Sequence, residues 1–356
     1  MSEQHAASGA VLSAGPDAAP LTFGDVPGEY AAARERCALF DQTGRGLVIV
    51  RGADASAFLH RLLANAVRGL EPGQGNRNLL LSSKGKVLFD FDLAIESDAI
   101  ELSTSPGSAE RLLAALEMYH FSEKVELEDA SERSAPLALA GPASAAVVRT
   151  VLGIEPPSVD HASAHGTLEG RAVKITALSV AGMPGLRIDA GPQLARTLWE
   201  RLVAAGAEPA GLVAYDCVRV EQGAAEPGVD IDDNVYPQEA RLESAFSLEK
   251  GCYVGQEVVA KIDTYGGLNK RLCALRVVHD DPIPRGTKLG LIEEGEWREV
   301  GLVTSWAYSF ALDTGLVLAY VKRRYQQPGT ELLLEQGPAS ATIVELPVRA
   351  RVATQP

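Results

Sequence analysis

Residues 249–257 read Glu-Lys-Gly-Cys-Tyr-Val-Gly-Gln-Glu, a run that places many polar groups beside a thiol. Gly251 and Gly255 lie four residues apart, and glycine lets the backbone bend or approach another group closely. Cys252 and Tyr253 lie between the two glycines. The stretch therefore predicts a compact turn that carries a thiol and a phenol.

The segment after this turn, residues 258–260, reads Val-Val-Ala and predicts a short buried strand. The residues before the turn predict an α+β scaffold. Residues 46–52 form a β-rich run closed by glycine, and residues 58–67 place apolar side chains at helical spacing. Residues 82–85 then join two strand-like runs in a predicted hairpin.

After Pro136 the pattern of strand, turn and helix begins again, which indicates two related α+β halves. From Leu272 short apolar runs alternate with turns, a spacing that predicts a small all-β module, a barrel. We place the boundary near Asn269. We expect a disordered tail over residues 1–20, a first α+β half over residues 21–135 and a second α+β half with the turn over residues 136–269. A C-terminal β-barrel is expected over residues 270–350 and another tail over residues 351–356.

A chain of 356 residues exceeds one ordinary core and suggests two or three domains. Its composition, 46% hydrophobic and 22% charged, is that of an ordinary soluble globular protein. The 33 Lys and Arg against 47 Asp and Glu give a net charge of −14, which argues against nucleic acid as a partner. No run approaches the ~18 apolar residues of a membrane span, so no membrane partner is expected.

The cysteines and the start of the chain indicate a compartment. The first 20 residues lack a basic region followed by an apolar one, so they do not resemble a secretory signal.

Residues 230–234 lack the spacing of a calcium loop and are expected to form a solvated turn. No metal site is expected, because paired His and Cys spacing is missing. Reduced thiols in the cytoplasm are expected, since CxxC pairs are missing among Cys37, Cys217, Cys252 and Cys273.

Several motifs occur in an order that resembles the tetrahydrofolate-binding fold of the glycine-cleavage T-protein. They are Gly-Leu-Val-Ile-Val-Arg-Gly-Ala-Asp at residues 46–54, Pro-Gly-Gln-Gly at 72–75, Arg-Val-Glu-Gln-Gly at 219–223 and Pro-Gln-Glu-Ala at 237–240. The Lys-Gly-Cys-Tyr-Val-Gly-Gln-Glu of residues 250–257 is similar to the signature of one branch, the YgfZ folate-binding proteins.

The resemblance implies an α+β, T-protein-like folate-binding fold of two related halves with a C-terminal small β-barrel. It also implies tetrahydrofolate, or a one-carbon derivative of it, as the cofactor. The YgfZ branch is linked to iron–sulfur cluster assembly and repair, so the first expectation is a tetrahydrofolate-binding accessory protein with iron–sulfur assembly or client proteins as partners. The alternative is a tetrahydrofolate-dependent aminomethyltransferase or demethylase. A third class is a scaffold that binds proteins and no folate.

The turn supplies the first candidate site residues. Cys252 is a candidate catalytic thiolate or ligand, helped by Lys250 and by backbone N–H groups, and the alternative is a buried, inert cysteine. Lys250 orients an anionic ligand or forms a surface ion pair. Tyr253 stacks on an aromatic ligand or fills the core, and the core is favoured. The cofactor-binding set that the turn is expected to provide is Lys250, Gly251, Tyr253, Gly255 and Gln256.

Glu221 matches the T-protein glutamate that binds the pterin ring. An ionised carboxylate only accepts hydrogen bonds, so it can bind both the amino group and the ring N–H of a pterin. The alternative is a solvated glutamate at the edge of a secondary-structure element. Tyr215, six residues earlier, either stacks on the ligand or packs in the core.

Asp90 is the remaining candidate. T-proteins carry an acidic pair after the hairpin, whereas this chain has Phe89-Asp90, and the lost acid counts against aminomethyl transfer. Asp90 is a candidate for proton transfer or for binding a cationic intermediate. The alternative is an ion pair with Lys84, Lys86 or Arg77. The residues alone leave open whether the protein is an enzyme; if it is, the expected catalytic groups are those of Asp90 and the thiol in the turn.

Overall fold

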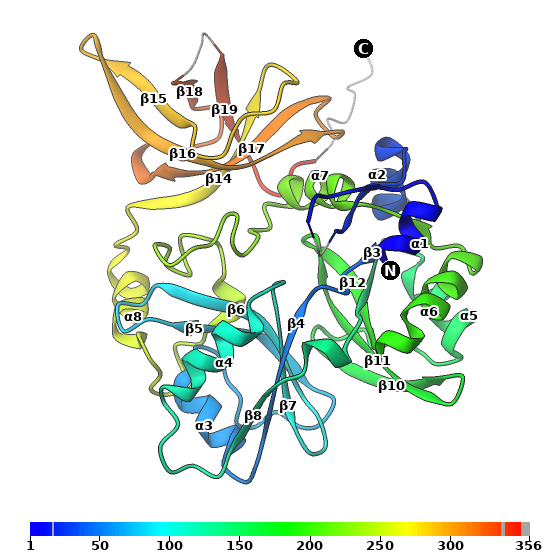
Figure 1. Ribbon diagram of the computed structural model, residues 1–356. Coiled ribbons are helices and arrows are strands. Elements are labelled where there is room, and N and C mark those ends of the chain that lie inside the picture. The colour runs from blue at the N-terminus through cyan, green and yellow to red at the C-terminus, as the bar shows by residue number, and fades with distance from the viewer. Residues whose placement is uncertain (16–17, 336–338, 350–356) are drawn as a thin grey trace. The chain divides into compact units, whose positions relative to one another are not determined.

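The computed structural model describes residues 1–15, 18–335 and 339–349. Its contacts divide the chain into two compact units, Met1–Ala214 with Ser244–Gln256 and Tyr215–Glu243 with Glu257–Pro356 (Figure 1). The second expected tail, at residues 351–356, lies outside the described residues. The same holds for residues 16–17 of the first expected tail and for residue 350 of the expected barrel.

A five-stranded antiparallel sheet forms one core of the first unit, in the order β5-β6-β7-β4-β8. Helices α3 (Ala55–Leu62) and α4 (Ala109–Glu117) pack on it through apolar faces that include Phe58 and Leu112 (Figure 1). The strand expected from residue 46 is confirmed; the helix expected over residues 58–67 forms but ends at Leu62. The strands are β4 (Gly46–Arg51), β5 (Gly75–Leu81), β6 (Val87–Ile95), β7 (Ile100–Thr104) and β8 (Glu126–Asp129).

A six-stranded sheet forms the other core of the first unit, in the order β10-β11-β12-β9-β3-β13. Helices α5 (Ser144–Leu152) and α6 (Pro192–Ala204) pack on it through Val148 and Leu198. The sequence places residues 38–41 in the first half, but as β3 they pair antiparallel with β9 of the second half. The elements are α2 (Val26–Glu35), β3 (Ala38–Asp41), β9 (Leu137–Ala140), β10 (Ser163–Leu168), β11 (Arg171–Val180), β12 (Met183–Ala190) and β13 (Glu208–Pro209).

The N-terminal segment differs from the expected disordered tail. It contains helix α1 (Ser2–Ala7) and a two-stranded sheet of β1 (Val11–Leu12) and β2 (Pro20–Thr22). His5 is fully buried, with its Nε2 atom 2.6 Å from Oδ2 of Asp41 and its ring centroid 4.5 Å from that of Trp199. The expectation fails because this long-range polar and aromatic contact leaves no periodic signal in a segment rich in Ala, Ser and Gly.

Charged side chains join the two sheets of the first unit. Oδ2 of Asp92 on β6 accepts a hydrogen bond from Nη1 of Arg187 on β12 at 2.8 Å, and Oδ1 lies 3.1 Å from Nε2 of His161. Burial raises the pKa of Asp92, but the bond with His161 and the charge of Arg187 outweigh it and hold the pKa far below its usual range. Lys174 on β11 forms a second bridge, to Glu101 on β7. These ion pairs fix how the two sheets meet.

A closed six-stranded barrel forms most of the second unit, in the order β14-β17-β16-β15-β18-β19. Alternate residues such as Leu275 and Val277 of β14 fill its core, because successive side chains of a strand point to opposite faces. The expected C-terminal barrel is confirmed. Its strands are β14 (Lys270–Val277), β15 (Lys288–Glu293), β16 (Glu296–Ser309), β17 (Thr314–Lys322), β18 (Glu331–Leu334) and β19 (Ser340–Val344).

The second unit also contains most of α7 (Leu212–Gln222), in which Arg219 forms a buried ion pair with Asp230 and both residues hydrogen-bond to the barrel through Ser305. Arg219 on α7 is 3% exposed, and its Nη1 atom donates to Oδ2 of Asp230 at 2.8 Å. The hydroxyl of Ser305 on β16 donates to the other carboxylate oxygen at 2.7 Å. The solvated turn expected at residues 230–234 is therefore wrong for Asp230, because the guanidinium neutralises its charge inside the protein.

The strand expected at residues 258–260 is also wrong, because these residues lie in helix α8 (Gln256–Tyr265). Glu257 and Lys261 form an ion pair of 2.6 Å at a spacing of four residues, which supports a helix. Of the apolar run only Val259 is buried. A three-residue apolar run fits either type of element, so its neighbours decide. In the described part of the chain no helix is both long and apolar enough to cross a membrane.

Replacing Asp92 by Asn removes one of the two carboxylates that neutralise the buried guanidinium of Arg187, the other being Asp189 at 3.1 Å. We expect the free energy of unfolding of the first unit to fall by roughly 2 kcal/mol, because charge-assisted hydrogen bonds to Arg187 and His161 are lost. The pKa of Asp92 is lower in the folded protein than in the unfolded chain. Its contribution is therefore complete above about pH 4 and is lost as the pH falls further.

Urea unfolding across this pH range measures both effects. Glu155→Gln is the matched control, since Glu155 is an exposed partner of Arg149 and its loss should change stability little. Equal losses of stability in the two variants would contradict the role given to Asp92.

Candidate functional site

Lys250 fastens the turn at residues 249–257 to the end of helix α3. Its ammonium group donates hydrogen bonds to the backbone carbonyls of His60 and Leu63, where the helix ends. A cation at this position satisfies carbonyls that lack a partner within the helix and interacts favourably with the helix dipole. Burial lowers the pKa of Lys250 to about 8.

His60 makes this contact reciprocal. Its Nδ1 atom accepts hydrogen bonds from the backbone N–H groups of Val67 and Arg68, both at 3.1 Å. An imidazole nitrogen that accepts carries no proton, so Nε2 carries it and donates to the carbonyl of Lys250 at 3.2 Å. Burial and the nearby ammonium of Lys250 lower the pKa of His60, which favours this neutral form.

The two glycines of the turn meet different surroundings, although both have positive φ angles, 100° at Gly251 and 81° at Gly255. A Cβ atom at Gly255 would lie 2.5 Å from the carbonyl oxygen of Ser82 in the β5–β6 hairpin. A Cβ atom at Gly251 would meet no atom within 4 Å. Gly255 therefore lets the turn lie directly against the hairpin, whereas Gly251 supplies a backbone conformation alone.

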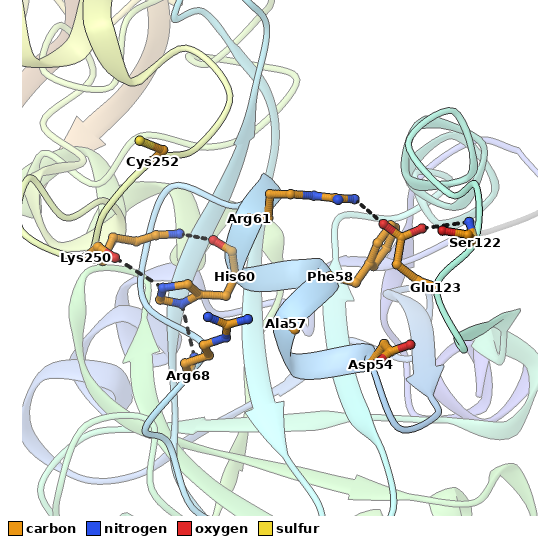
Figure 2. A pocket seen from close by; sticks show the side chains of 10 residues that line it. All are labelled: Asp54, Ala57, Phe58, His60, Arg61, Arg68, Ser122, Glu123, Lys250 and Cys252. Atoms are coloured by element: carbon orange, nitrogen blue, oxygen red, sulfur yellow. Dashed lines mark hydrogen bonds and ion pairs between the residues drawn. The ribbon is translucent and has the colours of Figure 1, made fainter.

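An open cavity of about 630 Å³ in the first unit adjoins the turn. Cys252 is exposed and lines this cavity, whereas Lys250 extends toward the end of α3 (Figure 2). The expected alternative, a buried cysteine, is therefore wrong. The lining residues are Asp54, Ala57, Phe58, His60, Arg61, Arg68, Ser122, Glu123, Lys250 and Cys252.

The charges around this cavity are only partly balanced. Glu123 accepts hydrogen bonds from the backbone N–H groups of Phe121 and Ser122 and from Arg61, and these bonds lower its pKa to about 2. Arg61 thus has a counter-charge. Within the described residues, the guanidinium of Arg68 has no acidic partner. The cavity therefore combines an exposed thiol with an unbalanced cation, a combination suited to an anionic or thiol-reactive group.

Tyr253 and Gln256 complete the turn. Tyr253 is 7% exposed, and its ring centroid lies 5.2 Å from Nζ of Lys250. Burial raises the pKa of the Tyr253 phenol to about 12. The position in the core that the sequence favours for Tyr253 is therefore observed. Gln256 begins α8, and its backbone N–H donates to the carbonyl of Tyr253 at 3.3 Å.

Asp90 lies on β6 and does not line this cavity. It is 7% exposed and forms a two-point ion pair with Arg77 on β5, with Nε–Oδ1 and Nη2–Oδ2 distances of 2.9 and 2.5 Å. Arg77, one of the three basic partners considered for Asp90 from the sequence, is observed in this role. A guanidinium bound in this way holds the carboxylate in one orientation.

Glu221 and Tyr215 lie on α7 and belong to the second unit. Glu221 is fully buried, so the solvated glutamate considered above is wrong. Its Oε1 atom accepts from the hydroxyl of Ser309 at 2.7 Å and from the backbone N–H of Ala311 at 3.0 Å, after the end of β16. A ligand can reach this carboxylate only if the segments that cover it move. Tyr215 is half-buried.

Of the residues that line the cavity, sequence reasoning named only Lys250 and Cys252 as site residues; those it missed include His60, Arg61, Arg68 and Glu123. They lie far from the turn in sequence, as the separation of 190 residues between His60 and Lys250 shows. Their local patterns are those of solvated positions. The one usable signal is the pair of basic residues in the last turn of α3, where cations are common. In the described ranges, no group of three or more His, Cys, Asp or Glu is placed to hold a metal ion.

Comparison with known proteins gives the same domain order. Residues 1–250 match the GCVT N-terminal domain, and residues 270–348 match the glycine cleavage T-protein C-terminal barrel domain. An aminomethyltransferase of Geobacillus kaustophilus is 32% identical over 322 residues, which cover 88% of this chain and 86% of the relative. A chloroplastic protein of Arabidopsis thaliana, named as a transferase, is 29% identical over 310 residues, which cover 86% of this chain and 70% of that protein.

The crystal structure of the glycine cleavage system aminomethyltransferase T from Bartonella henselae superposes with a TM-score of 0.86 at 27% identity. The match covers 98% of this chain and 97% of that one. Two α+β cores followed by a closed barrel thus define a protein of the T-protein fold. The chain belongs to the glycine-cleavage T-protein family.

Substituting Ala at Gly255 should detach the turn from the hairpin. The added Cβ would clash with the carbonyl of Ser82, and the positive φ adds strain, so we expect a loss of stability of roughly 2 kcal/mol or more. Gly251→Ala adds strain without the clash and should cost about 1 kcal/mol. Thermal unfolding of the two variants measures the difference, and equal losses would show that close contact with the hairpin is not what Gly255 provides.

Proposed function

We propose that this protein is a tetrahydrofolate-dependent one-carbon transferase of the aminomethyltransferase type. The observation that carries the proposal is the extent of the likeness: both family domains match, and nearly the full chain superposes on an aminomethyltransferase T. Aminomethyltransferases carry the one-carbon unit on tetrahydrofolate. A likeness this long at 27–32% identity supports shared ligand chemistry in addition to shared fold.

In this proposal Glu221 binds the pterin ring. An ionised carboxylate only accepts hydrogen bonds, through two oxygens, so Glu221 could accept from two donors of one ligand. The amino group and ring N–H of a pterin are donors of the matching kind. Because Glu221 is fully buried, binding would include a movement of the segments that cover it.

Asp90 is the group proposed to act during transfer. When bound, tetrahydrofolate supplies the nitrogen atoms that accept the one-carbon unit. Arg77 holds the Asp90 carboxylate in one orientation, so Asp90 can stabilise positive charge or hold a proton at a fixed point. Phe89 occupies the position of the acid that T-proteins carry beside it. Its ring lies 5.7 Å from the guanidinium carbon of Arg111, where it has a packing role instead.

Isothermal titration with tetrahydrofolate and a turnover assay with aminomethyl and N-methyl donors test this proposal. Wild-type protein should bind tetrahydrofolate and form methylene-tetrahydrofolate. Glu221→Gln should weaken binding at least about tenfold, since a charge-assisted hydrogen bond is lost. Asp90→Asn should retain binding and lose turnover.

Glu296→Gln, at an exposed position of β16, is the matched control and should change neither property. Thermal unfolding of Glu221→Gln separates a binding defect from a folding defect. Binding without turnover in the wild type would contradict the transferase, and an absence of tetrahydrofolate binding would contradict the folate site altogether.

A second candidate is the accessory role in iron–sulfur cluster assembly or repair that the YgfZ-like signature suggests. The exposure of Cys252 favours it, because Cys37, Cys217 and Cys273 are buried and only the thiol of the turn is open to a client protein or ligand. In this candidate, the fastened turn presents Cys252 beside the cavity of the first unit.

Deletion of the gene followed by complementation tests the second candidate. Strains with the gene deleted, or complemented with Cys252→Ser, should show reduced activities of iron–sulfur enzymes under oxidative stress. Complementation with wild type or with Ser122→Ala, a change in the same cavity, should restore them. Unchanged enzyme activities in the deletion strain would rule out the accessory role.

A further inference from the structure

A second cavity, distinct from the one beside the turn, lies wholly within the second unit. Its volume is about 660 Å³, and its walls are the Gly-Gly segment after α8, part of β16 and the residues that follow β17. Four cations and one acid line it. The lining comprises Gly266, Gly267, Leu268, Asn269, Arg298, Glu299, Val300, Lys322, Arg323, Arg324 and Tyr325.

Lys322, Arg323 and Arg324 have no counter-charge among the described residues. Nζ of Lys322 donates to the backbone carbonyl of Glu299 at 2.7 Å, and Nη1 of Arg323 donates to that of Gly266 at 2.7 Å. The guanidinium of Arg324 lies 5.5 Å from the ring centroid of Tyr325. Among the residues that the structure describes, none of these three cations forms an ion pair.

The other charges at this cavity are already neutralised. Nη1 of Arg298 lies 2.8 Å from Oε2 of Glu293, and the carboxylate of Glu299 lies 3.3 Å from Nζ of Lys288. The cavity therefore carries a charge excess of about three positive charges in a chain whose net charge is −14. An anionic ligand would offset this local positive charge, which is opposite in sign to the net charge of the protein.

The chemistry of the lining indicates which anion fits. A lysine ammonium has three donors and a guanidinium has five, so one carbonyl bond each leaves most of these donors available. Guanidinium groups bind carboxylate and phosphate oxygens in pairs. Leu268, Val300 and the ring of Tyr325 supply an apolar wall on the same cavity. A ligand with several anionic groups and an apolar or aromatic part matches both features.

We propose that this cavity of the second unit binds a small organic anion that carries two or more phosphate or carboxylate groups. Its volume falls within the range of roughly 300–1,000 Å³ that is typical of small-molecule sites. The anionic groups contact Lys322, Arg323 and Arg324, and the rest of the ligand contacts Tyr325. This site is independent of the proposed one-carbon chemistry.

Titration calorimetry at low salt tests the proposal with citrate, tripolyphosphate and metal-free ATP, and with adenosine as the neutral probe. At least one anion should bind, and binding should weaken as salt is added. Preference for citrate or tripolyphosphate distinguishes carboxylate from phosphate as the recognised group. Tighter binding of ATP than of tripolyphosphate, without binding of adenosine, would show that the aromatic part contributes.

Two substitutions test the site by independent means. Arg324→Gln removes a cation that makes no hydrogen bond in the described residues, and binding should weaken at least about tenfold. Gly267→Leu adds a side chain to the wall of the cavity and takes up part of it; binding should weaken while the protein still folds, because a Cβ at Gly267 meets no atom within 4 Å and its φ is not positive.

Arg196→Gln is the matched control, since it removes an exposed arginine charge from α6 in the other unit and should leave binding unchanged. Two outcomes would overturn the proposal. One is no binding of any of the three anions at millimolar concentration. The other is a loss of affinity in Arg196→Gln equal to that in Arg324→Gln, which would show attraction to the overall charge alone.

Discussion

The hydrogen bonds from the Lys250 ammonium to the carbonyls of His60 and Leu63 are the constraint on which the candidate site of the first unit depends. A helix end leaves carbonyls without partners, and a buried ammonium needs acceptors, so each group satisfies the other. This exchange joins segments 190 residues apart. The thiol of Cys252, two residues further on, is thereby held at the cavity without itself being bound.

Elsewhere in the protein, paired charges likewise join segments that are separate in sequence. Asp92 with Arg187 and Lys174 with Glu101 join the two sheets of the first unit, and in the second unit Arg219 with Asp230 joins helix α7 to the loop that follows it. Buried ion pairs add little net stability, because desolvation offsets most of the attraction. They do penalise any arrangement that leaves one charge unpaired. We infer that these pairs define the geometry of each unit more than they strengthen it.

The sequence predicted the features that local interactions determine and missed those that depend on contacts between residues distant in sequence. The strand from Gly46, the helix around Phe58 and the barrel come from local periodicity, and the sequence predicted them. Family motifs added the order of the domains. The burial of Asp230 and the order at His5 depend on partners distant in sequence, Arg219 being 11 residues and Asp41 36 residues away, and no local pattern encodes them.

The residues of the candidate site fall into the same two groups, those that the sequence identified and those that only the fold brings together. The sequence identified Cys252 and its glycines, because the turn is a continuous motif. It could not identify His60 or Arg68, which the fold brings to the cavity from another part of the chain. The exposure of Cys252 and the burial of Glu221 also follow from tertiary packing.

The pairing of β3 with β9 has a consequence for the order of folding. Residues 38–41 leave the ribosome almost 100 residues before Leu137–Ala140, the strand against which they lie. During synthesis the backbone groups of this early strand therefore stay unpaired, and its apolar side chains stay uncovered, until β9 has been made. All strands of the five-stranded sheet, in contrast, have been synthesised by Asp129. We expect that sheet to form first on the nascent chain, with the N-terminal strand protected by other contacts or by chaperones until the later sheet emerges.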